Sequence, residues 1–373
     1  VVSTTTRTGQ KLAQTAFADT ADLVFYFPFD WKSTVHRALR HIKPSVVLLM
    51  ETEIWFNFIR ESYHAGARLT IVNGRLSEKS FNRYGKIRIF MKRVLGYLDL
   101  ALMQENADAT RLMSLGIRAS KVRVTGNLKF DHSIEAAEID LTNEFKKRFG
   151  GDDNRPLIIA ASTHEPEEKW ILNAFCSTAN DGPDPRPRLL IAPRHPERFA
   201  EVAAMIGQFR DSTECEWRDF SFVRRSETQT ENDKAVDVIL LDTVGELRSV
   251  YPLADLVFVG GSLIRHGGQS ILEPAAVGKA IVTGPYTHNF DAVVKAFLEK
   301  KALVQLPTAP QDFHIVERLY EVFGHLLEDE NERLELANNA RMVMEAGRGA
   351  TENTIKYLGA IFDQSSVRRK HYG

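Results

Sequence analysis

The sequence of 373 residues has little cysteine, no long apolar run and almost no net charge. Its two cysteines, Cys176 and Cys215, are too few for a disulfide framework or a zinc site, so we expect two buried, reduced thiols, as in a cytosolic protein. No apolar run reaches the ~18 residues of a membrane-spanning helix. The 48 basic and 49 acidic residues nearly cancel, which gives no general case for nucleic-acid binding.

The chain is long enough for two domains, each with a core of its own. Short apolar runs alternate with helical stretches, a pattern that predicts α/β domains with parallel sheets covered on both faces. The first half has expected strands at Leu23–Phe27, Val46–Met50, Leu69–Val72, Leu100–Met103 and Val122–Val124. The second half has them at Pro156–Ala160, Arg188–Ala192, Val238–Leu241 and Leu256–Val259. Functional loops should follow the carboxyl ends of these strands.

A glycine-rich stretch follows the strand Leu256–Val259. Gly260, Gly261 and Ser262 come first, and Gly267 and Gly268 precede a helix expected to start near Gln269 or Ser270. Glycine pairs at a strand-to-helix junction let backbone N–H groups approach an anion. Glu273, one turn into the helix, can accept hydrogen bonds from sugar hydroxyls. The alternative is a tight turn with a glutamate favoured by the helix dipole; we favour a nucleotide-sugar site.

Three other strands of the second half end in polar residues. The strand at 156–160 leads to Ser162, Thr163 and His164. After 188–192 come Arg194, suited to an anion, and His195, which could equally be a turn residue. Gly245 and Glu246 open a short helix expected over Gly245–Leu253, where Glu246 is either a ligand contact or, as we prefer, a partner of the helix dipole.

Carboxylates and bases follow the strands of the first half. Glu51 and Glu53 come after Val46–Met50, where they could reach an acceptor or simply be acids at a helix start. Arg75 could bind a carboxylate or phosphate with two hydrogen bonds, and Ser77 is typical of a helix N-cap. Lys129, in the segment after Val122–Val124, could border a cleft between the domains.

The helix expected over Glu78–Leu98 is strongly basic. Arg75 to Arg93 contains seven basic residues, Lys79 and Arg83 among them, and one acid, Glu78. Aromatic and apolar residues lie between them. Either this is a solvated basic face over an apolar core, or it contacts an anionic membrane surface or a phosphorylated lipid, which we favour.

Several motifs in a fixed order resemble the Kdo transferases, which add 3-deoxy-D-manno-octulosonic acid (Kdo) to lipid A precursor. They are STTTRTG at 3–9, ETEIW at 51–55, NGRLSEKSF at 73–81, GNLKFD at 126–131, STHEPEE at 162–168, APRHPERF at 192–199 and the glycine-rich stretch itself. The family usually differs at Phe56, Gly74, Pro166 and Gln269–Ser270.

The resemblance implies an inverting, metal-independent and cofactor-free glycosyltransferase of the GT-B fold, with two doubly wound parallel-sheet domains facing a cleft. It would move Kdo from CMP-Kdo to lipid IVA in lipopolysaccharide core biosynthesis, at the cytoplasmic face of the bacterial inner membrane. The alternatives are a GT-B epimerase acting on a UDP-sugar and a non-catalytic nucleotide-sugar-binding protein.

The resemblance also assigns regions and residues. The expected regions are an acceptor domain over 1–137, a linker over 138–155, a donor domain over 156–345, and a helix crossing back with a tail over 346–373. Glu51 and Glu53 are the catalytic candidates, although the family's base, with its membrane anchor and first βα unit, is expected upstream of Val1. Acceptor binding falls to Arg75, Lys79, Arg83 and Lys129. Donor binding falls to Ser162, Thr163, His164, Arg194, His195, Gly245, Glu246, Gly260, Gly261, Ser262, Gly267, Gly268, Ser270 and Glu273.

Overall fold

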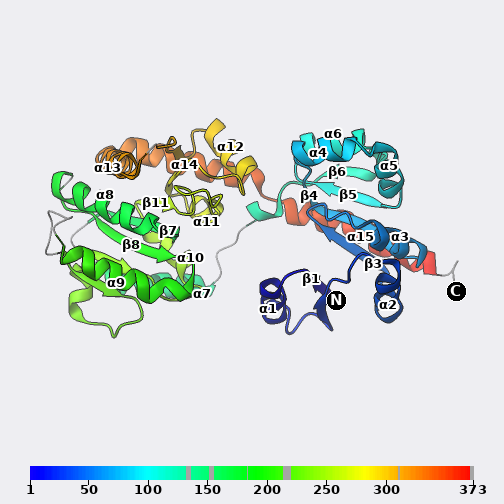
Figure 1. Ribbon diagram of the computed structural model, residues 1–373, viewed down its shortest axis with the longest axis horizontal. Helices are drawn as coiled ribbons and strands as arrows, with labels where there is room; N and C mark the ends of the chain where they lie inside the picture. Colours follow the sequence, from blue (N-terminus) through cyan, green and yellow to red (C-terminus); the bar gives the residue numbers. More distant parts are fainter. Residues whose placement is uncertain (132–135, 151–154, 183, 213–219, 310, 370–373) are drawn as a thin grey trace. The chain divides into compact units, whose positions relative to one another are not determined.

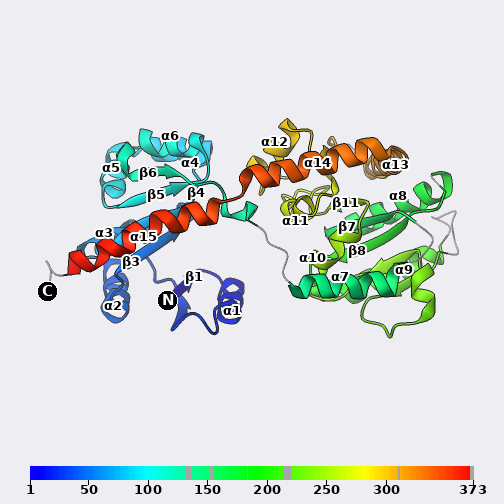
Figure 2. The ribbon, with the colours of Figure 1, turned by 180° about the vertical axis from the view of Figure 1, so that it is seen from behind.

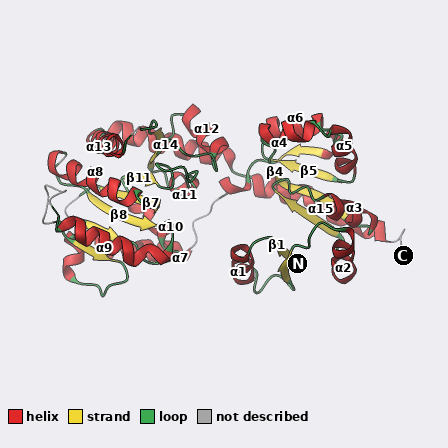
Figure 3. Cartoon of the chain, viewed as in Figure 1, coloured by secondary structure: helices red, strands yellow, loops and turns green. Residues whose placement is uncertain are grey.

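The computed structural model describes residues 1–131, 136–150, 155–182, 184–212, 220–309 and 311–369. The chain forms two compact units, one of Val1–Asp131 with Arg348–Gly373 and one of His132–Gly347 (Figure 1). In each unit, parallel strands are packed between helices (Figure 3). The first division therefore falls after residue 131, where the sequence suggested 137.

The first unit contains two parallel sheets. Strands β1 (Val2–Thr4) and β2 (Val24–Tyr26) pair with each other, and a four-stranded sheet has the order β3 (Val46–Met50), β4 (Arg68–Gly74), β5 (Leu100–Met103), β6 (Val122–Val124). The expected single sheet is therefore split, because within the described residues β3 pairs only with β4. The helices are α1 (Arg7–Ala16), α2 (Lys32–Ile42), α3 (Phe56–His64), α4 (Glu78–Gly85), α5 (Arg88–Gly96), α6 (Asn106–Ser114) and α15 (Ala350–Arg369).

Local signals explain where these helices begin and end. Ser77 is the N-cap of α4, since its side chain accepts a hydrogen bond from the backbone N–H of Ser80, as expected. The long basic helix of the sequence analysis is instead two helices, because Ile87 leaves the helical region at φ −120° and ψ 35°. Helix α3 begins at Phe56 with no acid in its first turn, so Glu51 and Glu53 are loop residues and the helix-start interpretation is wrong.

In the core of the first unit, helices pack against the faces of the four-stranded sheet. Leu69 and Ile71 of β4 are fully buried against Leu95 of α5 and Leu112 of α6. On another side of the sheet, Ile361 of α15 packs with Leu100 and Leu102 of β5. Figure 2 shows α15 lying along this sheet. The last helix of the chain is thus part of the first unit's core.

The second unit is built on one seven-stranded parallel sheet. Its order is β13 (Val304–Gln305), β12 (Ala280–Thr283), β11 (Leu256–Val259), β7 (Leu157–Thr163), β8 (Arg188–Pro193), β10 (Val238–Leu240), β9 (Phe222–Arg224). The helices are α7 (Ala136–Phe149), α8 (Glu167–Asp181), α9 (Phe199–Arg210), α10 (Leu247–Val250), α11 (Leu272–Ala276), α12 (Asp291–Glu299), α13 (Asp312–Glu328) and α14 (Glu330–Gly347). Central strands β7 and β11 are apolar runs without alternation, because both of their faces are covered.

Two expectations for this unit are corrected. The segment expected as a linker forms α7, whose Phe145 and Phe149 are buried and whose Arg148 Nε donates to Asp233 Oδ2 at 2.6 Å. These three residues share one helix face, which packs the segment onto the unit. Cys176 is buried but disulfide-bonded, so it is not the expected reduced thiol. Cys215 lies outside the described residues.

Candidate functional site

A cavity of about 310 Å³ opens in the second unit where its central strands end. We call it the donor-side cavity. Residues at or beyond the carboxyl ends of four different strands line it: Ser162 near the end of β7, Arg194 after β8, Gly245 after β10, and Ser270 and Glu273 after β11. Its volume is at the lower end of the range found for small-molecule sites. Five of the predicted donor-binding residues therefore meet at one place.

The glycine-rich loop is organised by a residue that the sequence analysis did not single out, Glu167. Its carboxylate accepts hydrogen bonds from the backbone N–H groups of His164, Gly261, Ser262 and Leu263 at 2.7–3.0 Å. Burial raises the pKa of Glu167 to about 7, while the four donated hydrogen bonds act to lower it. Because Glu167 is fully buried, a protein carboxylate occupies the position expected for a ligand's anion.

The predicted phosphate role of Gly260, Gly261 and Ser262 is therefore wrong for their backbone amides. The amide of Gly260 donates to Ala161 O, and that of Gly268 donates to Gly261 O, each at 2.8 Å. Ser262 is fully buried, and its hydroxyl donates to Val259 O and accepts from Gly284 N. At Gly261, φ is +64° and an added Cβ would lie 3.3 Å from the His164 ring, so the glycine allows a close approach of loop and ring. These residues build the loop.

Glu273 lines the cavity, but its helix differs from the expected one. Helix α11 begins at Leu272 and has five residues, so a helix starting at Gln269 or Ser270 is not formed and the helix dipole adds little. The charge of Glu273 helps to raise the pKa of buried Tyr251, after the larger effect of burial. Glu273 is therefore a half-buried acid at the wall of the cavity.

Glu246 lies in an ion pair outside the lining of the donor-side cavity. Its carboxylate bonds Arg225 Nε at 3.0 Å and the Thr243 hydroxyl. Helix α10 begins one residue later, at Leu247. The role of Glu246 is therefore to pair with Arg225, and not to interact with the dipole of a one-turn helix.

Three imidazole rings lie together beside the cavity. The His164 ring centroid is 4.1 Å from that of His266 and 5.3 Å from that of His195. Burial, followed by the charges of His266 and His195, lowers the pKa of His164 to about 4. Thr163 is fully buried and does not line the cavity. His266 and the cavity-lining Gln269 were missed, because a lone polar residue in a glycine-rich loop has no periodicity to mark it.

In the first unit, side chains tie together the loops at the carboxyl ends of the strands. Glu51 Oε1 is 2.9 Å from Lys129 Nζ, and the Thr52 hydroxyl bonds both the N–H and the carbonyl of Arg75. Asn73, at φ +52°, accepts from Leu128 N at 3.0 Å. The structure thus brings Glu51, Arg75 and Lys129 to one edge. Lys79 and Arg83 are exposed on α4.

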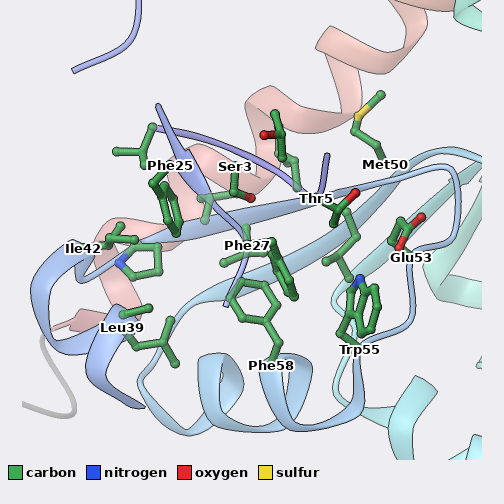
Figure 4. A pocket seen from close by; sticks show the side chains of 18 of the residues that line it. Ser3, Thr5, Phe25, Phe27, Leu39, Ile42, Met50, Glu53, Trp55 and Phe58 are labelled. Carbon is green, nitrogen blue, oxygen red and sulfur yellow. The ribbon is translucent and has the colours of Figure 1, made fainter. Parts of the chain in front are cut away.

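A larger cavity of about 670 Å³ lies between the two sheets of the first unit, lined by both β1 and β3. Most of its wall is apolar. Figure 4 shows Glu53, Trp55 and Thr5 on one side, and Phe25, Leu39 and Ile42 on the other. Among the described residues that line it, Glu53 is the one acid, whereas Glu51 is the partner of Lys129.

The predicted basic surface is present on α4 and α5. Lys79, Arg83, Lys86, Arg88, Lys92 and Arg93 are all exposed. Ile87, between the two helices, is 48% exposed, and in α5 Ile89 is 90% exposed and Phe90 is 42% exposed. We call these nine residues the basic-apolar surface.

Comparisons with known proteins agree with this arrangement. A family model described as 3-deoxy-D-manno-octulosonic-acid transferase matches residues 1–132. A 3-deoxy-D-manno-octulosonic acid transferase of Haemophilus influenzae is 32% identical over 97% of this chain and 80% of its own length. The 3-deoxy-D-manno-octulosonic acid transferase of Bordetella pertussis is 31% identical over 89% of this chain and 73% of its own length. The chain belongs to the Kdo transferase family. It is therefore a glycosyltransferase, as the motifs of the sequence indicated.

The solved structure of the UDP-GlcNAc 2-epimerase of Neisseria meningitidis, bound to UDP-GlcNAc, is similar in fold. Its TM-score is 0.55 at 14% identity, over 95% of this chain and 90% of the other. The predicted GT-B fold of this Kdo transferase family member is confirmed at the level of its two α/β units. Among the described residues, no helix combines the length and apolarity needed to cross a membrane.

Proposed function

We propose that the protein transfers Kdo from CMP-Kdo to lipid IVA in lipopolysaccharide core biosynthesis. The donor-side cavity is the main support. In a chain of the Kdo transferase family, it brings a guanidinium, a hydroxyl and a carboxylate from the segments after β8 and β11 to one place of nucleotide size, through Arg194, Ser270 and Glu273. A nucleotide sugar needs these three kinds of group.

In this proposal the donor-side cavity holds the nucleotide. The Glu273 carboxylate accepts hydrogen bonds from the ribose hydroxyls, and the exposed Arg194 guanidinium neutralises the phosphate. The phosphate's positive partner is a side chain, because the amides of Gly261 to Leu263 already donate to Glu167. The arginine charge would also stabilise the departing CMP, which suits a metal-independent transfer.

The transfer is proposed to invert the anomeric carbon. The acceptor hydroxyl attacks that carbon as its bond to the phosphate oxygen breaks, and a carboxylate takes the hydroxyl proton. Glu53, which lines the larger cavity of the first unit, is proposed to take this proton or to position the acceptor. Glu51, paired with Lys129 and near Arg75, is better suited to orienting a phosphorylated acceptor.

The basic-apolar surface is proposed to contact the anionic cytoplasmic face of the inner membrane, where a lipid acceptor is found. Its six cations attract anionic headgroups, while Ile87, Ile89 and Phe90 can enter the headgroup region. Exposed apolar side chains between exposed cations distinguish this surface from a merely solvated basic face.

Calorimetric titration of the protein with CMP and with UDP tests the donor assignment. We expect CMP to bind more tightly than UDP, and Glu273→Ala to weaken CMP binding by about 1.5–3 kcal/mol, since it removes charge-assisted hydrogen bonds to the ribose. Glu299→Ala, at the exposed end of α12, is the control and should leave the affinity unchanged. Preference for UDP would favour the epimerase, and unchanged CMP affinity in folded Glu273→Ala would reject the ribose assignment.

Transfer of labelled Kdo to lipid IVA tests the reaction. Glu53→Gln should lower kcat by about 10²–10⁴-fold if this carboxylate takes the proton. Glu51→Gln should instead raise KM for the acceptor. Binding of CMP-Kdo without any transfer would identify a nucleotide-sugar-binding protein.

A further inference from the structure

His164 is a buried imidazole two residues beyond Ser162, which lines the donor-side cavity. It is 7% exposed and follows directly after β7. Ser162, two residues earlier, lines the cavity, and so does Arg194, whose N–H donates to Thr163 O at 3.0 Å. A bound ligand in the cavity would therefore lie close to this ring.

The hydrogen bonds of His164 define its tautomer. Nδ1 lies 3.2 Å from the carbonyl oxygen of Ser162, which can only accept, so Nδ1 bears the proton. In the neutral ring, Nε2 then has a bare lone pair. Within the described residues this buried atom has no hydrogen-bond partner. A buried acceptor without a donor is uncommon in folded proteins and calls for an explanation.

The surroundings keep the ring neutral. His195, His266 and Arg194 lie around it, and with burial as the largest cause the pKa of His164 is lowered to about 4. The Glu167 carboxylate is 4.0 Å from Nδ1 and already accepts hydrogen bonds from four amides. At neutral pH, Nε2 can therefore accept a hydrogen bond from a hydroxyl, but it cannot donate one to a phosphate or carboxylate.

We propose that Nε2 of His164 accepts a hydrogen bond from a hydroxyl group of the transferred sugar, which makes His164 a positioning residue for the donor. This rests on the proposed function. His266 is the cover of the site. Its exposed side chain lies against the His164 ring, with the ring planes tilted by 38°. It precedes Gly267 and Gly268, whose φ values are +108° and +78°. The His266 ring turns aside when the donor binds.

Titrations with CMP and with CMP-Kdo test this assignment, because both ligands contain the nucleotide and only the second contains the sugar. His164→Phe keeps an aromatic ring but removes the acceptor. We expect it to weaken CMP-Kdo binding about three- to tenfold and to leave CMP binding unchanged. His164→Gln restores an acceptor and should recover part of the loss. His266→Ala removes only the cover and should keep both affinities.

Equal weakening of both ligands by His164→Phe, or no change in either, would overturn the proposal while the proposed function stands. Failure of the wild-type protein to bind CMP would instead reject the proposed function. Nitrogen-15 NMR of histidine-labelled wild-type protein is the second measurement, in case His164→Phe does not fold. We expect an unprotonated Nε2 whose signal shifts with CMP-Kdo and not with CMP; a protonated Nε2 in the free protein contradicts the proposal.

Discussion

The two units differ in how they hold the loops that follow their central strands. In the second unit, one buried carboxylate, Glu167, holds the glycine-rich loop through four amide hydrogen bonds. In the first unit, the corresponding loops are joined by separate surface contacts, such as the half-exposed pair Glu51–Lys129. The comparison teaches that one α/β topology can support a pre-organised donor pocket in one unit and an open, exposed edge in the other.

The largest expected effect is on stability, and it follows from replacing the buried Glu167 of the second unit. Glu167→Ala leaves four buried amides without their acceptor, and we expect the free energy of unfolding of the second unit to fall by about 5 kcal/mol. Urea unfolding followed by circular dichroism measures it. Glu168→Ala is the control for an adjacent buried acid, since it breaks the single ion pair with Arg198. If Glu167→Ala cost no more than Glu168→Ala, the loop would not depend on Glu167.

The next largest effect is on vesicle binding by the basic-apolar surface of the first unit. Replacing Lys86, Arg88, Lys92 and Arg93 by glutamate should remove at least about 4 kcal/mol of binding to anionic vesicles, at about 1 kcal/mol per charge near the surface. Vesicle sedimentation at low and high salt measures it, and the difference should fade with salt. The control replaces four other exposed cations of the same unit, Lys11, Lys32, Arg37 and Arg40. Equal losses in the two variants would point to net charge instead of this surface.

A smaller effect concerns the pH dependence of the second unit. The folded pKa of His164 is about 4, below its usual value of 6.5, so the unfolded chain binds more protons between these values. Stability from this group is present above pH 6.5 and is lost as the pH falls. From pH 7 to pH 5, the wild type should lose about 2 kcal/mol more than His164→Phe. If the free energies of unfolding of the two proteins changed equally with pH, the His164 ring would not be held neutral in the folded protein.

The smallest effect concerns Asn73, a buried residue near the end of β4 in the first unit. Asn73→Ala removes the acceptor for Leu128 N and places alanine at φ +52°, so we expect a loss of about 1 kcal/mol. Asn73→Asp keeps an acceptor and tolerance of this conformation, so it should come closer to wild type as the pH falls and the buried carboxyl is protonated. Thermal unfolding measures both. A loss above that of Glu167→Ala would reverse the comparison between the two units.

Much of the fold could be predicted from the sequence. Runs such as Leu100–Met103 and Leu256–Val259 are apolar and buried throughout, and strands covered on both faces require this composition. The helix break at Ile87 and the packed helix α7 were missed. No proline and no glycine pair marks the helix break at Ile87. The many charged residues of 138–155 indicated a linker, although α7 has an apolar face.

The sequence by itself determined the family, the α/β class and the loops that line the donor-side cavity, because motifs and strand ends are local features. Only the tertiary structure decided which groups in those loops are available to a ligand. Glu167 meets Gly261 across 94 positions of sequence, so its hold on the amides could not be predicted from the glycine pattern. In the part of the chain that the structure describes, the same loop packing leaves the buried Nε2 of His164 without a donor. Such contacts depend on how distant segments pack, which no local pattern records.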